Sequence, residues 1–316
     1  MSDNMKIVFL DEYTLGGANL DAIRSLGDYT GYTKTSPEEV VERAKDAEVV
    51  IVNKVVIGER EMSALPNLRL ICVAATGVNN IDLVAASERG ILVRNAVGYS
   101  THTVAEATLG SVLALLRQMN YYDRYVKSGE YSASGEWVNF DRPTHRLWGK
   151  NWGIVGMGNI GREVARLASV FGCKVAYYST SGAERKEEYE RMSLDELLAW
   201  SDIVSVHCPL NDKTRGLIGN EEIAKMKPSA VIVNVARGGI VVEGAVAQAL
   251  DEGRLAGAAF DVYPSEPMPS TSPLLHTKDP DKLLLSPHNA WSAVESIESL
   301  VECIANNIKD YLKSNK

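Results

Sequence analysis

The chain has 316 residues, of which 45% are hydrophobic and 23% are charged, and its formal net charge is −8. This length fits two domains of about 100–200 residues each, and the apolar content excludes disorder as the main state of the chain. The negative charge argues against a nucleic-acid-binding surface, because binding to phosphates requires clustered Lys and Arg.

In the first third of the chain, short β-branched runs alternate with amphipathic stretches. Strands are expected at residues 6–10, 48–55, 68–75 and 91–95, and helices at residues 36–47 and 82–89. The first of these helices carries a capping signal, with Ser36 at the N-cap and Glu39 three residues later. Strict alternation of strands and helices predicts a parallel sheet with helices on both faces.

A long helical pattern follows at residues 101–118, and the segment from 121 to 150 then changes character. It contains seven aromatic residues in 30 positions, whereas aromatic residues make up 7% of the whole chain. Such an excess is typical of a surface buried against a second subunit. A local mini-core packed on the same chain explains it equally well, and both interpretations stay open.

A second alternating series begins at residue 151 and fills most of the remaining chain. Strands are expected at residues 152–155, 174–178, 203–207, 230–235, 256–262 and 283–286, followed by an amphipathic helix at residues 292–314. The sequence therefore predicts an α/β protein with two doubly wound units and no low-complexity linker between them.

Other classes of protein are excluded by what the sequence lacks. The four cysteines are far apart, with no C-x-x-C pair, so we expect free thiols in the cytoplasm and neither a metal site nor a disulfide framework. No apolar run approaches the ~18 residues of a membrane span, and the N-terminal segment is neither a signal nor a transit peptide.

Residues 156–161, with the sequence G-M-G-N-I-G, lie between an apolar strand and a helical stretch. That context is the one a dinucleotide-binding turn requires. Gly156, Gly158 and Gly161 permit a tight turn and close backbone approach, so that a pyrophosphate meets free N–H groups at the start of the helix. The motif predicts NAD(H) or NADP(H) as the cofactor.

The choice between the two cofactors stays open. The end of the next strand normally carries an acid that binds the adenosine ribose, but this chain has Ser179 there. The missing carboxylate removes the main barrier to a 2′-phosphate, and Arg185 and Lys186 are close enough in sequence to bind one.

Three polar residues follow the apolar segments of the second series. Arg237, Glu266 and His288 each come after an expected strand, and the carboxyl ends of parallel strands face the ligand crevice. Arginine grips carboxylates, histidine transfers protons near neutral pH, and glutamate orients an imidazole and favours its protonated form. Each of these residues alone is common on protein surfaces, but the three together suit the reduction of a ketone.

With these motifs, the chain resembles the D-isomer-specific 2-hydroxyacid dehydrogenase family. The runs that carry the resemblance cover most of residues 70–292, among them TGVNNIDL, GIVGMGNIGREVARLA, SDIVSVHCPLNDKTRGLI, VIVNVARGGIVVEGAVAQALDEGRLAGAAFDVYPSEP and LLLSPHNAW. The resemblance implies that Arg237 binds the substrate carboxylate and that His288, paired with Glu266, is the general acid and base.

The resemblance also implies binding residues and an architecture. The substrate is expected to contact Thr76, Gly77, Val78, Arg237 and Trp291, although core packing is an equally good reading of Trp291. The cofactor is expected to contact Gly156, Gly158, Asn159, Ile160, Gly161, Ser179, Cys208, Thr214, Ala236 and Asp261. A Rossmann-like dinucleotide-binding domain (99–288) would be inserted into a flavodoxin-like substrate-binding domain (1–98 and 289–316), with a homodimer formed through residues 99–150.

The likeness narrows the expected substrate. The run Pro287–Trp291 resembles the glycerate dehydrogenase, or hydroxypyruvate reductase, branch of the family, which implies reversible reduction of a small 2-keto acid. Two alternatives stay open: a phosphoglycerate dehydrogenase of serine synthesis, and a redox-sensing, NAD-binding protein like a corepressor.

Overall fold

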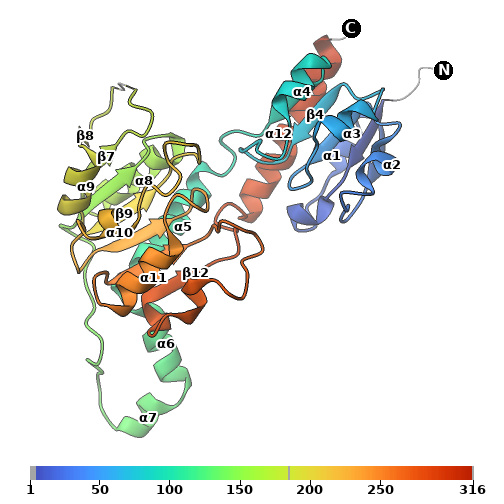
Figure 1. The fold of residues 1–316 in the computed structure, drawn as a ribbon. Coiled ribbons are helices and arrows are strands. Elements are labelled where there is room, and N and C mark those ends of the chain that lie inside the picture. Colours follow the sequence, from blue (N-terminus) through green and yellow to red (C-terminus); the bar gives the residue numbers. More distant parts are fainter. Residues whose placement is uncertain (1–4, 184–185, 315–316) are drawn as a thin grey trace. The chain divides into compact units, whose positions relative to one another are not determined.

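A computed structural model describes residues 5–183 and 186–314 (Figure 1). The chain divides into two compact units, with residues 1–100 and 292–316 in unit 1 and residues 101–291 in unit 2. The divisions fall after Ser100 and after Trp291 rather than after residues 98 and 288. Unit 2 is thus one continuous segment inserted into unit 1.

Unit 1 is built on a five-stranded parallel sheet. Its strands are β1 (Lys6–Phe9), β2 (Asp28–Gly31), β3 (Val49–Val52), β4 (Leu70–Val73) and β5 (Leu92–Asn95), in the order β2-β1-β3-β4-β5. Its helices are η1 (Glu12–Leu15), α1 (Asp21–Arg24), α2 (Val40–Ala44), α3 (Glu59–Ser63), α4 (Leu83–Glu88) and α12 (Val294–Ser314). Every residue of β3 and β4 is buried, as expected for central strands covered on both faces.

Unit 1 departs from the expectation in several elements, since η1, α1, α3 and β2 are not among the expected ones and one expected helix is shorter. The helix expected at 36–47 begins only at Val40, because residues 37–39 form a turn in which the Glu39 carboxylate accepts the Ser36 N–H at 2.9 Å. Strand β2 has the sequence D-Y-T-G, without an apolar run, so hydrophobic patterning could not reveal it.

Unit 2 is built on a seven-stranded parallel sheet. Its strands are β6 (Asn151–Val155), β7 (Lys174–Tyr178), β8 (Glu190–Arg191), β9 (Ile203–Val206), β10 (Val231–Asn234), β11 (Gly257–Phe260) and β12 (Leu283–Leu285), in the order β12-β11-β10-β9-β6-β7-β8. The chain runs outward from β6 in one direction and returns to β9 on its other side, so the strand order reverses there. In open parallel sheets, ligands bind at such a reversal, outside the carboxyl ends of the strands.

Helices cover both faces of this sheet. The helices of unit 2 are α5 (Thr101–Leu116), α6 (Met119–Lys127), α7 (Glu130–Ser134), α8 (Asn159–Val170), α9 (Leu194–Trp200), α10 (Asn220–Ile223) and α11 (Glu243–Asp251), with short turns η2 (Pro273–His276) and η3 (Pro280–Lys282). One face packs against α5 and α8, and the other against α9, α10 and α11. The central strands are therefore buried on both sides, as the prediction of a doubly wound sheet requires.

The aromatic segment after α5 forms an arm, residues 119–146. Figure 1 shows α6 and α7 projecting from the end of α5, away from the sheet. Arg124 binds Asp281 through two hydrogen bonds of 2.5 and 2.6 Å, and Arg142 binds Asp279 through two of 2.8 and 3.0 Å. Both guanidinium groups lie over the ring of Tyr121, so the base of the arm is fixed to the turn that precedes β12.

Only some of the aromatic side chains of the arm contact one another. Tyr121 contacts Tyr122 and Tyr125, and Tyr125 contacts Tyr131, but none of these four residues is buried. Trp137 and Phe140 are 93% and 85% exposed. The tyrosines therefore pack against one another without forming a buried core, and the other two rings lie in solvent.

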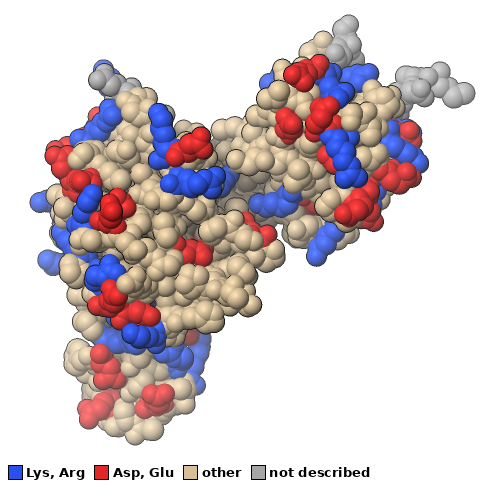
Figure 2. Space-filling view, in the orientation of Figure 1, with Lys and Arg blue, Asp and Glu red and all other residues tan. Residues whose placement is uncertain are grey.

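Charges are mixed over the surface. On the face drawn in Figure 2, Lys and Arg side chains alternate with Asp and Glu, without a broad cationic field. Among the described residues, no helix is long and apolar enough to cross a membrane.

Candidate active site

The glycine-rich turn connects β6 to α8 in a conformation that only glycine adopts easily. Gly156 has φ +99°, and a Cβ there would lie 2.8 Å from the backbone nitrogen of Cys208. A Cβ on Gly161 would lie 2.3 Å from the Gly156 carbonyl oxygen. Nothing lies within 4 Å of the corresponding position on Gly158, so this side of the turn is open, directly before α8 begins at Asn159.

An open groove of about 530 Å³ begins at this turn. It is lined by Gly156–Gly158, by Ser179–Ser181 after β7, and by His207–Pro209 and Asn211–Lys213 after β9. The N–H groups at the start of α8 suit a pyrophosphate, and the groove continues from there to the end of β7, where a dinucleotide places its adenosine.

The expected cofactor residues lie at different depths around this groove. Ser179 and Cys208 line it, and burial raises the pKa of the Cys208 thiol to about 11, so the thiol is neutral. Thr214 is fully buried, and its hydroxyl accepts the Asn211 N–H and donates to the Pro209 carbonyl. We therefore expect Thr214 to shape the groove rather than to line it.

Several lining residues of the groove, among them His207 and Lys213, are not among the residues expected from the sequence. His207 lines it, with its Nε2 2.9 Å from the Ser205 hydroxyl, and burial lowers the pKa of the imidazole to about 3, so the ring is neutral. Lys213 brings an ammonium group to the same groove. No short motif marks either residue. Lys186 is exposed, and Arg185 lies outside the described residues.

The three candidate catalytic side chains stand on the loops after β10, β11 and β12, which are neighbours in the sheet. After β10, the buried Asn234 folds the chain by donating to the Arg237 carbonyl at 3.0 Å and accepting from the Ala236 N–H at 3.1 Å. The Arg237 guanidinium donates one hydrogen bond of 2.7 Å to the Ala236 carbonyl. A guanidinium has five N–H donors, so it keeps donors for a carboxylate.

Glu266 and His288 form the central contact of the site. The Nδ1 atom of His288 lies 2.6 Å from Oε2 of Glu266, and Oε1 of Glu266 accepts the Tyr263 N–H at 3.0 Å. The His288 side chain is 23% exposed and that of Glu266 32%, so the pair is open to a ligand. With Nδ1 engaged, Nε2 is the ring nitrogen left to exchange a proton with that ligand.

A second carboxylate, that of Asp261, holds the loop that carries His288. It accepts hydrogen bonds from the Ser286 hydroxyl at 2.6 Å and from the backbone N–H groups of Asn289 and Ala290 at 2.9 and 3.0 Å. Burial raises the pKa of this carboxyl, and the three hydrogen bonds oppose that rise. Asp261 also lines a cavity of about 390 Å³ between α5 and the ends of β10–β12.

The expected substrate residues belong to both units. In unit 2, the Trp291 indole N–H donates to the His288 carbonyl at 2.9 Å, which sets this ring beside the catalytic loop. In unit 1, the Thr76–Val78 loop follows β4, and the Asn95 side chain donates to the Thr76 carbonyl at 2.7 Å. Binding of a substrate carboxylate by this loop stays a prediction. No cluster of three metal-ligating side chains occurs among the described residues.

Comparison with known proteins identifies similar chains. Residues 109–290 match the family model for the NAD-binding domain of D-isomer specific 2-hydroxyacid dehydrogenases. Hydroxypyruvate reductase of Blautia hydrogenotrophica is 36% identical over 98% of both chains. Glycerate dehydrogenase of Methylorubrum extorquens is 36% identical over 97% of this chain and 96% of that one. A solved acyclic imino acid reductase in complex with NADPH and D-Arg has a TM-score of 0.87, with 26% identity over 98% of both chains.

The glycine turn generates a first prediction. Replacing Gly156→Ala places a methyl group against the Cys208 backbone and strains a φ of +99°, so the turn must deform. We expect affinity for both NADH and NADPH to fall about tenfold or more, measured by fluorescence titration, while far-UV circular dichroism is unchanged. As a matched control, Gly244→Ala in helix α11 has free space for its methyl group and should keep wild-type affinity. Equal affinities of the two variants would contradict the role given to the turn.

Proposed function

Since the chain belongs to the D-isomer specific 2-hydroxyacid dehydrogenase family, an NAD-binding family of oxidoreductases acting on CH–OH groups, we propose that it reduces a small 2-keto acid of the hydroxypyruvate or glyoxylate type to the D-2-hydroxy acid, reversibly. The observation that carries this proposal is the 2.6 Å contact between His288 and Glu266. These two residues lie on two loops of the unit that also contains Arg237 and the dinucleotide turn.

Each of the three residues has one task in this reaction. Arg237 binds the substrate carboxylate through its guanidinium and polarises the neighbouring ketone. His288 donates a proton from Nε2 to the carbonyl oxygen as the C2 carbon is reduced, and takes it back in the oxidative direction. Glu266 holds the ring and compensates its positive charge. The bound dinucleotide supplies the hydride.

The substrate and compartment rest on separate observations. The hydroxypyruvate reductase and glycerate dehydrogenase relatives support a substrate of three carbons or fewer. The four cysteines are free, which suits a reducing compartment, and we place the enzyme in the cytoplasm.

The experiment that tests this function is an assay of NADH and NADPH oxidation by the purified protein. Hydroxypyruvate, glyoxylate, pyruvate and phosphohydroxypyruvate are the substrates to compare. We expect the largest kcat/KM with hydroxypyruvate or glyoxylate. A preference for phosphohydroxypyruvate would identify a phosphoglycerate dehydrogenase instead. Tight nucleotide binding without turnover of any substrate would identify a redox-sensing protein.

The role of His288 generates a further prediction. His288→Ala removes the proton donor, so kcat for the reduction should fall about 10²–10⁴-fold, whereas the Kd for the dinucleotide should change less than about threefold. The matched control is His276→Ala, because His276 lies in η2 with its ring nitrogen 3.1 Å from the Ser270 carbonyl, on a different segment from the His288 loop. Wild-type turnover in His288→Ala would refute the acid–base assignment.

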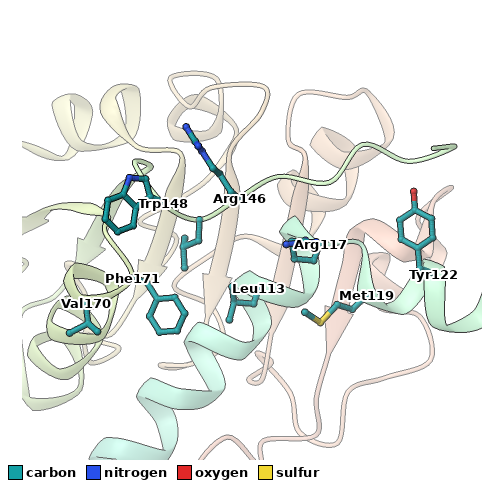
Figure 3. Close-up of a pocket in the computed structure, with 9 residues that line it drawn as sticks. Leu113, Arg117, Met119, Tyr122, Arg146, Trp148, Val170 and Phe171 are labelled. Atoms are coloured by element: carbon teal, nitrogen blue, oxygen red, sulfur yellow. The ribbon is translucent and has the colours of Figure 1, made fainter. Parts of the chain in front are cut away.

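We also propose that two copies of the chain associate through the region 99–150. A cavity of about 870 Å³ lies between the end of α5, the start of α6 and the end of α8 (Figure 3). Trp148 and Phe171 lie at one end of it, and Tyr122 and Met119 at the other. It is lined by Leu113, Arg117, Met119, Tyr122, Arg146, Leu147, Trp148, Val170 and Phe171.

The occupant that best fits this cavity is the arm of a second copy. Arg117 and Arg146 have no ion-pair partner in the part of the chain that the structure describes. The arm carries the carboxylate of Glu136 directly before the exposed ring of Trp137, with Phe140 three residues further on. The tip of the arm therefore brings one carboxylate and two exposed aromatic rings, which complement the two arginines and the aromatic lining of the cavity, and a two-fold dimer would use both surfaces twice.

Sedimentation equilibrium at micromolar concentration tests this association. We expect a dimer for the wild-type chain, and a dissociation constant raised about tenfold or more for the double variant Trp137→Ala with Phe140→Ala, because aromatic anchors carry much of the energy of an interface. Val84→Ala, an exposed apolar residue of unit 1, is the control and should not change the dimer. A monomeric wild type, or an equally stable double variant, would contradict the proposal.

A further inference from the structure

Tyr263 belongs to a closed ring of hydrogen bonds that contains the His288–Glu266 pair. Its backbone N–H donates to Oε1 of Glu266 at 3.0 Å, and Oε2 of Glu266 lies 2.6 Å from Nδ1 of His288. The His288 N–H donates to the Ser286 carbonyl at 3.1 Å, and the Tyr263 hydroxyl donates to that same carbonyl at 2.9 Å. Tyr263 thus holds the Glu266 carboxylate through its backbone N–H and the loop that carries His288 through its hydroxyl.

Tyr263 also contacts the loop that carries Arg237. A Cβ built on Gly238 would lie 1.9 Å from the carbonyl carbon of Tyr263 and 2.0 Å from its oxygen, so the two backbones touch. Arg237 directly precedes this contact. The loops after β10, β11 and β12 therefore all meet at Tyr263.

The hydroxyl of Tyr263 acts on a strained part of the chain. His288 has φ +54°, a left-handed conformation that is uncommon for a residue with a side chain. Its N–H shares the Ser286 carbonyl with Tyr263, so the hydroxyl fixes the acceptor that holds His288 in this conformation. Tyr263 is 8% exposed, and burial raises the pKa of its hydroxyl to about 12, so it stays a donor over the working range of an enzyme.

We propose that Tyr263 is a positioning residue, whose hydroxyl, by holding the Ser286 carbonyl, keeps His288 against Glu266 and in place for proton transfer. This inference rests on the proposed function, because it assigns a role in that reaction to a residue that does not touch the substrate. It differs from the anchoring by Asp261, which holds the side chain of Ser286 and the residues after His288.

Tyr263→Phe removes the hydroxyl and keeps the buried ring. We expect kcat for 2-keto acid reduction to fall about three- to tenfold, the effect of one lost hydrogen bond, with the dinucleotide Kd within twofold of wild type. The primary isotope effect on kcat with the 4-deuterated dinucleotide should rise, because chemistry then limits turnover more strongly. In a Glu266→Gln background the same substitution should change kcat less than twofold, since both act through the placement of His288.

Tyr311→Phe is the matched control. The Tyr311 hydroxyl donates to Glu48 at 2.9 Å, and its pKa is also raised to about 12 by burial, but it lies in unit 1. This variant should keep the wild-type kcat and isotope effect. The inference is overturned if Tyr263→Phe keeps them too, or if its effect adds fully to that of Glu266→Gln.

Amide hydrogen exchange tests the inference without any turnover. We expect the His288 N–H to exchange faster in Tyr263→Phe than in the wild type, while the exchange rates of the strand amides of β11 are unchanged. If the wild-type protein reduces no 2-keto acid, the proposed function fails, and this exchange rate still decides whether Tyr263 holds the loop. Unchanged exchange at His288 overturns the inference.

Discussion

The approach of Gly238 to Tyr263 is the constraint on which the candidate site depends. No side chain fits between these two backbones, and the contact brings together the loops after β10 and β11, each of which carries one reactive group. The loop after β12 joins them through the hydrogen bonds of Ser286. Three neighbouring strands of a parallel sheet end at the same edge, which is common to all such sheets. The contacts of Gly238, Tyr263 and Ser286 then fix how the guanidinium, the carboxylate and the imidazole are arranged there.

Two carboxylates near His288 have different tasks because their environments differ. Glu266 is partly exposed and faces the ring, whereas Asp261 is buried and is used up by donors from residues 286–290. The exposed carboxylate faces the imidazole that would transfer the proton, and burial makes the second carboxylate a fixed anchor. A carboxylate therefore assists the proposed proton transfer at Glu266, whereas at Asp261 it keeps the His288 loop rigid.

The sequence allowed prediction of the parts of this structure that leave a local signal. The glycine spacing indicated the turn at 156–161, and hydrophobic alternation indicated both parallel sheets. Strand β2 was not predictable, because its four residues are polar and gain their place only by pairing with β1. The contact of the Tyr263 hydroxyl was also beyond prediction, since it depends on the Ser286 carbonyl, 23 residues away in the chain, rather than on residue type. The aromatic excess at 121–150 indicated unusual packing, but it did not show which of these side chains pack within the arm and which stay exposed for a partner.

The insertion of unit 2 into unit 1 has a consequence for biosynthesis. Helix α12 supplies Leu300, Ile304 and Ile308 to the core of unit 1, and Tyr311 and Asn307 bind residues of its sheet region. Because α12 follows the whole of unit 2 in the chain, the five-stranded sheet of unit 1 lacks this helix while roughly two hundred further residues are synthesised. The inserted unit is continuous, so it can fold on the emerging chain while unit 1 still lacks its last helix.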